Sequence, residues 1–110
     1  MRIVFPTTEN MSYMSHSASD INEAKYLTVL DIQNQDIVGV ETIKNYFASN
    51  NEDFVQTFKE NQYEAIVIPQ SASLPLNELK NAGINVYTDS QSQLVLSAFN
   101  DFLNQKLALA

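Results

Sequence analysis

The first half of the chain carries short apolar runs that are typical of strands. Residues 2–6, "RIVFP", form an apolar run that ends at a proline, as a buried strand does. Apolar and β-branched positions recur over 26–43 on both sides of Asn34 and Gln35, which predicts a β-hairpin. Asn-Gln is a weaker turn signal than Asn-Gly, because glutamine resists the positive φ of a two-residue turn.

The second half of the chain alternates strands with helices. The spacing of its apolar residues predicts a helix from Asn51, a strand at 64–69, a helix within 74–84, a strand at 84–88 and a helix from near Ser90. Gly83 provides a left-handed stop for the second helix, and Ser90 with Gln93 forms a candidate capping box for the third. Strands that alternate with helices pair in parallel through right-handed crossovers. The order therefore predicts an α/β fold with a mixed five-stranded sheet, one antiparallel strand from the hairpin and helices on the sheet faces.

Residues 7–24, "TTENMSYMSHSASDINEA", follow neither the apolar period of a helix nor that of a strand, so they are expected to form a loop. So long a loop in a compact domain is often functional or mobile. Within it lie two thioethers, Met11 and Met14, and the only imidazole of the chain, His16. Such soft sulfur and nitrogen donors suit copper(I) or an unsaturated metal cluster. The alternative is structural, because methionine often fills gaps in packing and a lone loop histidine is commonly just solvated.

Composition narrows the class of protein. A chain of 110 residues is the size of one domain, so 1–110 is expected to fold as a unit. The absence of cysteine excludes thiolate-held zinc and any iron–sulfur cluster ligated by this chain alone. The chain is acidic, with a net charge of −7 and singly spread basic residues, which disfavours nucleic-acid binding. It lacks both an apolar run of about 18 residues and a secretory signal, so we expect a cytoplasmic protein without a membrane span.

Five segments carry a resemblance to a known family: "MRIVFPT", "AKYLTVLDIQNQDI", "YEAIVIP", "LKNAGINVY" and "FNDFLNQKL". In this order they resemble the dinitrogenase iron–molybdenum cofactor biosynthesis domain, and they span nearly the whole chain. The resemblance implies a ribonuclease H-like three-layer fold. It also implies a non-catalytic carrier, since some members carry or store the iron–molybdenum cofactor or its precursor clusters. The implied ligand is an iron–molybdenum or iron–sulfur type cluster in transit.

The chain departs from the family at the ligand face. Members carry a Ser-x-x-His-Phe-Gly-Arg-Ala-like segment, where this chain has "SASDINEA" with Asp20 in place of the histidine. Members also carry a Gly-x-Ile-Gly turn, where this chain has "PQSASLP". Cluster binding is therefore expected to be diverged or lost. The residues predicted to face a ligand are Met11, Met14, His16, Asp20, Ser71 and Ser73, with His16 and Met14 as metal ligands and Asp20 and the serines as hydrogen-bonding groups.

Catalysis is not expected. A nuclease of the ribonuclease H-like kind holds two metal ions with three or four carboxylates, one of them on the first strand, and "RIVFPT" has none. No Gly-x-Ser-x-Gly elbow is present for serine hydrolysis.

The alternative function is a protein-interaction domain with no small ligand. It would use a sheet edge or the aromatic residues Tyr46 and Phe47, which otherwise pack over the sheet. A homodimer is one form of this alternative. The terminal "LALA" is expected either to dock on a second subunit or to fray.

Overall fold

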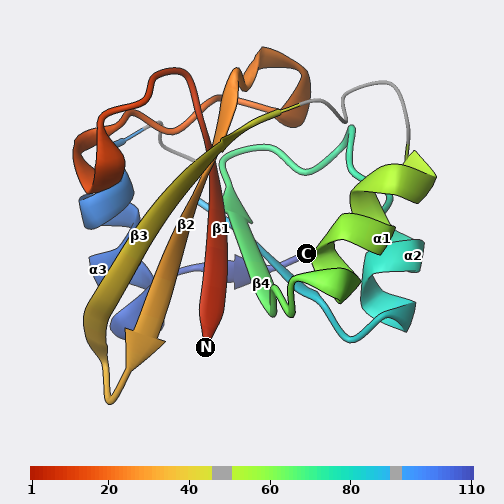
Figure 1. The fold of residues 1–110 in the computed structure, drawn as a ribbon. Coiled ribbons are helices and arrows are strands. Elements are labelled where there is room, and N and C mark those ends of the chain that lie inside the picture. Colours follow the sequence, from red (N-terminus) through yellow and green to blue (C-terminus); the bar gives the residue numbers. More distant parts are fainter. Residues whose placement is uncertain (46–50, 90–92) are drawn as a thin grey trace.

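The computed structural model describes residues 1–45, 51–89 and 93–110, and within them six strands form one sheet in the order β3-β2-β1-β4-β5-β6 (Figure 1). The strands are β1 (Arg2–Thr7), β2 (Tyr26–Gln33), β3 (Asp36–Lys44), β4 (Ala65–Ile68), β5 (Asn85–Thr88) and β6 (Ala108–Leu109). The helices are α1 (Asn51–Glu60), α2 (Leu76–Asn81) and α3 (Val95–Leu103), and two 3₁₀ turns, η1 (Ser12–Met14) and η2 (Ile21–Glu23), follow β1.

The pairing of the strands confirms the predicted α/β fold. β1, β4 and β5 are parallel neighbours, and β2 is antiparallel to both β1 and β3. The predicted count of five strands was one too few. The last apolar residues do not fray, because Ala108 and Leu109 pair antiparallel with β5 as β6; docking on a second subunit stays a prediction. A strand of two residues has no period from which it could be predicted.

Helices cover both faces of the sheet, which gives the three layers of a ribonuclease H-like fold. α1 and α2 pack on one face, and α3 packs on the other (Figure 1). Neighbouring residues of one strand enter opposite cores: Val4 contacts the α1–α2 core, and Ile3 and Phe5 contact the α3 core. Burial on both faces explains why β1 and β4 read as continuous apolar runs. In the described part of the chain, no helix has the length and hydropathy to cross a membrane.

The predicted hairpin is confirmed, and its turn has the conformation that glutamine resists. Asn34 has a φ of 53° and Gln35 a φ of 70°. Two successive residues with positive φ are typical of a type I′ turn, whose twist matches that of the two flanking strands. The long β2–β3 pairing therefore imposes a conformation that the sequence of the turn only weakly favours.

One helix boundary differs from its prediction. α3 begins at Val95, whereas the sequence predicted a start near Ser90, which lies outside the described residues. Leu94 is extended and forms an antiparallel bridge with His16 of the β1–β2 connection. Because Leu94 pairs with a residue distant in the sequence, the helix begins only at Val95. The predicted stop at Gly83 is confirmed, since its φ is 79°.

Arg2 links several strands at the amino end of β1. Its Nε donates to Asp31 Oδ1 at 2.8 Å, and Nη2 donates to Glu41 Oε2 at 2.8 Å. Its Nη1 donates to the carbonyl of Asn61 at 2.8 Å, and the guanidinium lies 4.9 Å from the ring centroid of Tyr63. One side chain therefore connects β1 with β2, β3 and the segment between α1 and β4.

We expect Phe58→Ala to lower the free energy of unfolding by about 3–5 kcal/mol. Phe58 is fully buried, stacks on Phe54 at 4.6 Å and meets Tyr63 edge-on at 5.1 Å, so truncation leaves a cavity in the α1–α2 core. Urea unfolding followed by circular dichroism measures the change. Val38→Ala, at a side chain that is 57% exposed, is the control and should shift stability by about 0.5 kcal/mol or less.

Stability should fall in alkaline solution through Tyr63. Burial raises the pKa of the Tyr63 phenol above its ordinary value of 10.0, and the carboxylate of Glu41 adds to the shift. A phenol whose pKa is raised by folding stabilises the protein below the unfolded-state pKa, and this contribution is lost as the pH rises through the folded-state pKa. We expect wild type to lose stability relative to Tyr63→Phe above about pH 10. Equal pH dependence of urea unfolding in the two proteins would contradict this expectation.

Candidate functional site

The candidate site lies where two connections meet at the carboxyl ends of parallel strands. The chain leaves β1 toward β2 on one side of the sheet, and it leaves β4 toward β5 on the other. Gln70 N–H, just after β4, donates to the carbonyl of Ser19 at 3.0 Å. Figure 1 shows the connection from β1 and the connection from β4 at the same edge of the sheet. Open α/β sheets bind their ligands at such a point, where the order of the strands in the sheet reverses.

The β1–β2 connection, residues 7–24, is tied to the end of β1. Thr7 and Ser17 form an antiparallel bridge, and Ala18 N–H donates to the carbonyl of Pro6 at 2.9 Å. The segment therefore extends the sheet locally beyond the point where β1 pairs with β4. Such backbone pairing satisfies groups that would otherwise be buried without partners.

The same segment is also tied to the start of α3. Ser17 N–H donates to the carbonyl of Gln93 at 2.8 Å, and Val95 N–H donates to the carbonyl of Ser15 at 2.9 Å. Ser15, Ser17 and Val95 are buried. The loop that the sequence marked as functional or mobile is thus held by hydrogen bonds on two sides.

Ser15 fixes the direction of His16, one of the predicted soft donors. Its side chain is buried and accepts a hydrogen bond from Met11 N–H at 2.7 Å. Ser15 is extended, with φ −68° and ψ 148°, so the next residue, His16, projects to the opposite side, while Met14 belongs to the 3₁₀ turn η1. Met14 is 47% exposed, and the His16 side chain is 63% exposed.

Met11 is exposed beside the same turn. Met14 N–H donates to the carbonyl of Met11 at 3.1 Å, which closes the 3₁₀ turn η1. Residues three apart in a 3₁₀ turn lie nearly above one another. Met11 is 59% exposed, so both thioethers and the imidazole are on the outer surface around one turn. Thioether and imidazole groups are donors of the type that soft metal ions prefer, and the metal site itself stays a prediction.

Glu9 is a residue of this region that the sequence analysis did not select. Its Oε1 accepts from His16 Nδ1 and also from the His16 main-chain N–H at 3.0 Å. The hydrogen bonds from His16 lower the pKa of the Glu9 carboxyl below its ordinary value of 4.5. In the sequence, Glu9 is only an acidic residue in the same loop as His16. Glu9 and His16 come into contact because residues 7–9 pair with residues 16–17.

Asp20 has a structural role in addition to its predicted one. Its Oδ1 accepts from Asn22 N–H at 2.8 Å and from Glu23 N–H at 3.2 Å, so Asp20 caps η2. Its predicted hydrogen bond to a ligand stays a prediction.

The six predicted residues fall into two groups. Met14 lies in η1, Met11 and His16 flank it, and η1 contacts α3, β2 and β3. Asp20 begins η2, and Ser71 and Ser73 lie in the β4–α2 connection, whose Leu74 N–H donates to the Ser71 carbonyl at 3.0 Å. Figure 1 shows η1 above α3 and η2 on the other side of the strand ends. The imidazole and thioethers are therefore the group that the fold presents around one turn.

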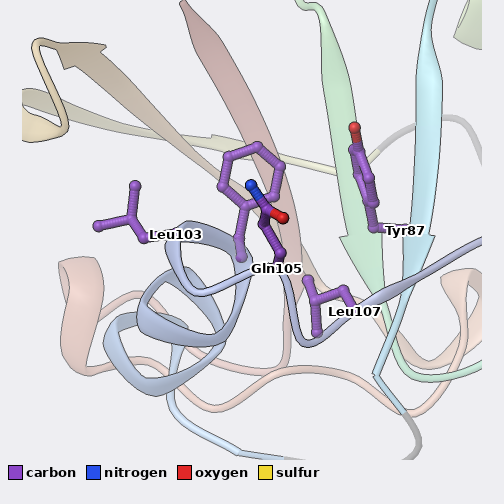
Figure 2. Close-up of a pocket in the computed structure, with 5 residues that line it drawn as sticks. Tyr87, Leu103, Gln105 and Leu107 are labelled. Atoms are coloured by element: carbon purple, nitrogen blue, oxygen red, sulfur yellow. The ribbon is translucent and has the colours of Figure 1, made fainter.

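Three described cavities are formed by other parts of the chain. A cavity of about 430 Å³ lies between β5, α3 and the segment that follows α3 (Figure 2), and its lining includes Tyr87, Leu103 and Gln105. A second cavity, of about 240 Å³, lies beside α2, and a third, of about 430 Å³, lies between the end of α1 and the residues that follow α2. Among residues 1–45, 51–89 and 93–110, no three His, Asp or Glu side chains gather as a metal site. Tyr46 and Phe47, the predicted aromatic patch, lie outside these ranges.

Comparison with known proteins identifies the fold. No family model and no curated protein matches the chain. Among solved structures, a candidate NifB protein from Thermotoga shares the fold with a TM-score of 0.80 and 21% identity, over 98% of this chain and 91% of that one. The apo form of the orange protein from Desulfovibrio gigas matches with a TM-score of 0.79 and 16% identity, over 99% and 92%. A candidate dinitrogenase from Methanocaldococcus jannaschii matches with a TM-score of 0.70 and 13% identity, over 100% and 94%.

We expect Ser15→Ala to lower the free energy of unfolding by about 0.5–1.5 kcal/mol, because Met11 N–H, in a part-buried hydrogen bond, loses its acceptor. The amide protons of Ser17 and Val95 should also exchange faster with solvent, since the anchored segment is loosened. Urea unfolding and hydrogen exchange by NMR measure the two effects. Ser73→Ala, at an exposed serine, is the matched control. Equal stability of the two variants would show that Ser15 does not anchor the loop.

Proposed function

We propose that this chain is a non-catalytic carrier that binds a soft metal ion or a metal–sulfur cluster reversibly. In this proposal it is a diverged relative of the dinitrogenase iron–molybdenum cofactor biosynthesis domain. The supporting observation is the exposure of Met11, Met14 and His16 around one turn whose inner side is anchored by buried Ser15. The fold shared with the orange protein and with a candidate dinitrogenase is in keeping with that resemblance, while the function is argued from the residues themselves.

Neutral, soft donors favour reversible binding. Two thioethers and one imidazole supply no negative charge, and the chain has no cysteine thiolate to hold a metal tightly. Such a set holds its metal weakly enough to pass it to a partner. Three side chains also leave positions on the metal open for the ligands of the recipient.

Of the two proposed cargoes, the charge of the protein favours the soft metal cation. The net charge is −7, and Glu9 lies in contact with His16. A negative surface attracts cations and repels anions over roughly the Debye length of about 8 Å at physiological salt. Copper(I) is therefore the probe that best matches both the donors and the charge.

We expect the protein to bind Cu(I) anaerobically in competition with a chromophoric chelator. His16→Ala and Met14→Leu should each weaken binding about tenfold or more, since loss of even a supporting group at a metal site costs about 10–100-fold. Met14→Leu keeps the apolar volume of the side chain and removes only the sulfur. Asn10→Ala, at an exposed neighbour in the same loop, is the control. A wild-type protein that takes no Cu(I) from the chelator, or a His16→Ala variant that binds equally, would reject the proposal.

A protein-interaction domain is the second candidate, and the observation in its favour is the edge strand β3. This strand has nine residues and pairs only with β2 in the described sheet. An exposed edge can pair with a strand of another chain. However, Asp31 pairs with Gly39 and Ile32 with Ile37, so Val38 is an extra residue that interrupts the edge. Bulges of this kind protect edges from pairing. Light scattering after size-exclusion chromatography distinguishes a dimer from a monomeric carrier.

A further inference from the structure

We infer that Glu9 is the positioning residue of the proposed carrier site and holds His16 so that Nε2 is the nitrogen that binds the metal. This inference rests on the proposed function, and it assigns a role to a residue outside the predicted site. The observation behind it is a carboxylate in contact with Nδ1 of the only histidine of the chain.

Backbone pairing sets the position of the Glu9–His16 pair. Thr8 N–H donates to the His16 carbonyl at 3.1 Å, and the bridge between Thr7 and Ser17 lies next to it. The Thr7 hydroxyl, buried in the sheet, donates to the Glu9 carbonyl at 3.1 Å. These hydrogen bonds therefore hold residues 7–9 beside residues 16–17 independently of the contact between the Glu9 and His16 side chains.

One oxygen of Glu9 makes both contacts with His16. Oε1 accepts from the main-chain N–H at 3.0 Å and from the ring at Nδ1. The carboxylate therefore follows the backbone of His16 and fixes the ring relative to it. A ring held this way has less freedom to lose when it binds a metal than a freely rotating one.

Because imidazole has two ring nitrogens, this contact determines which of them carries the proton and which can bind a metal. A neutral imidazole has one N–H and one lone pair, and an ionised carboxylate can only accept a hydrogen bond. Contact with Glu9 therefore places the proton on Nδ1 and leaves the lone pair on Nε2. Histidine ligands of metals almost always donate their other N–H in this way, often to a carboxylate.

The first experiment identifies the tautomer. Long-range ¹H–¹⁵N NMR spectra of the metal-free protein, taken at a pH where imidazole is neutral, report which ring nitrogen carries the proton. His16 is the only histidine, so its ring signals need no assignment. We expect the Nδ1–H form in wild type and a shift toward the Nε2–H form in Glu9→Ala. Glu23→Ala, at an exposed carboxylate of the same loop, should match wild type.

The second experiment measures Cu(I) affinity in the same proteins. Glu9→Ala should bind about tenfold to a hundredfold more weakly than wild type, as loss of a supporting carboxylate does at metal sites. Glu9→Gln should lie between them, because its amide oxygen still accepts from Nδ1. In wild type, Cu(I) should move the Nε2 resonance more than the Nδ1 resonance. Urea unfolding of each variant tests whether the fold is kept.

The outcomes separate this inference from the proposed function. A wild-type protein that binds Cu(I) while Glu9→Ala keeps both the tautomer and the affinity overturns the role of Glu9 and leaves the carrier proposal standing. A wild-type protein that binds no Cu(I) overturns both. Movement of Nδ1 in place of Nε2 on Cu(I) addition also overturns the role of Glu9.

Discussion

The candidate site depends on the pairing of residues 15–17 with the start of α3. The hydrogen bonds from Ser17 N–H to the Gln93 carbonyl and from Val95 N–H to the Ser15 carbonyl turn an irregular connection into an added piece of sheet. Ser15 is buried and extended, so His16, which follows it, projects outward. The same pairing places the start of α3 at Val95, later in the sequence than predicted. One backbone interaction thus determines both where the helix begins and where the imidazole points.

Most of the fold follows from short-range patterns. The apolar runs at β1 and β4 predict strands buried on both faces, and the β–α alternation predicts their parallel pairing. Gly83 ends α2 as its freedom to adopt positive φ predicts. The two misjudged features, β6 and the start of α3, both arise from pairing with distant residues. Ala108 pairs with Thr88, and Leu94 pairs with His16, and neither leaves a periodic signal in the sequence.

The residue types of the candidate site could be predicted from the sequence, but their arrangement in space could not. Met11, Met14 and His16 stand out because thioether and imidazole donors are rare in this chain. Glu9 does not, because its role depends on the register that places residues 7–9 beside 16–17. Asp20 was assigned by its place in a family motif, whereas its contacts show a helix cap. A helix cap can be predicted from local sequence, but the comparison of Asp20 with the family motif led to the prediction of a ligand role instead.

The difference between positions 16 and 20 has a physical consequence for any ligand. The resemblance implies an imidazole at position 20, in the part of the loop that meets the β4–α2 connection through Ser19 and Gln70. In this chain position 20 is a carboxylate engaged in capping η2, and the imidazole lies at 16, on the side of α3. A ligand bound through His16 would therefore be bordered by η1, and the turn carrying Ser71 would have no need of the glycines that let a backbone approach a bulky group. In the proposed function, the histidine at position 16 belongs to a site on one loop, and the serines of the β4–α2 turn stand where the resemblance implies the glycines of a site between two loops.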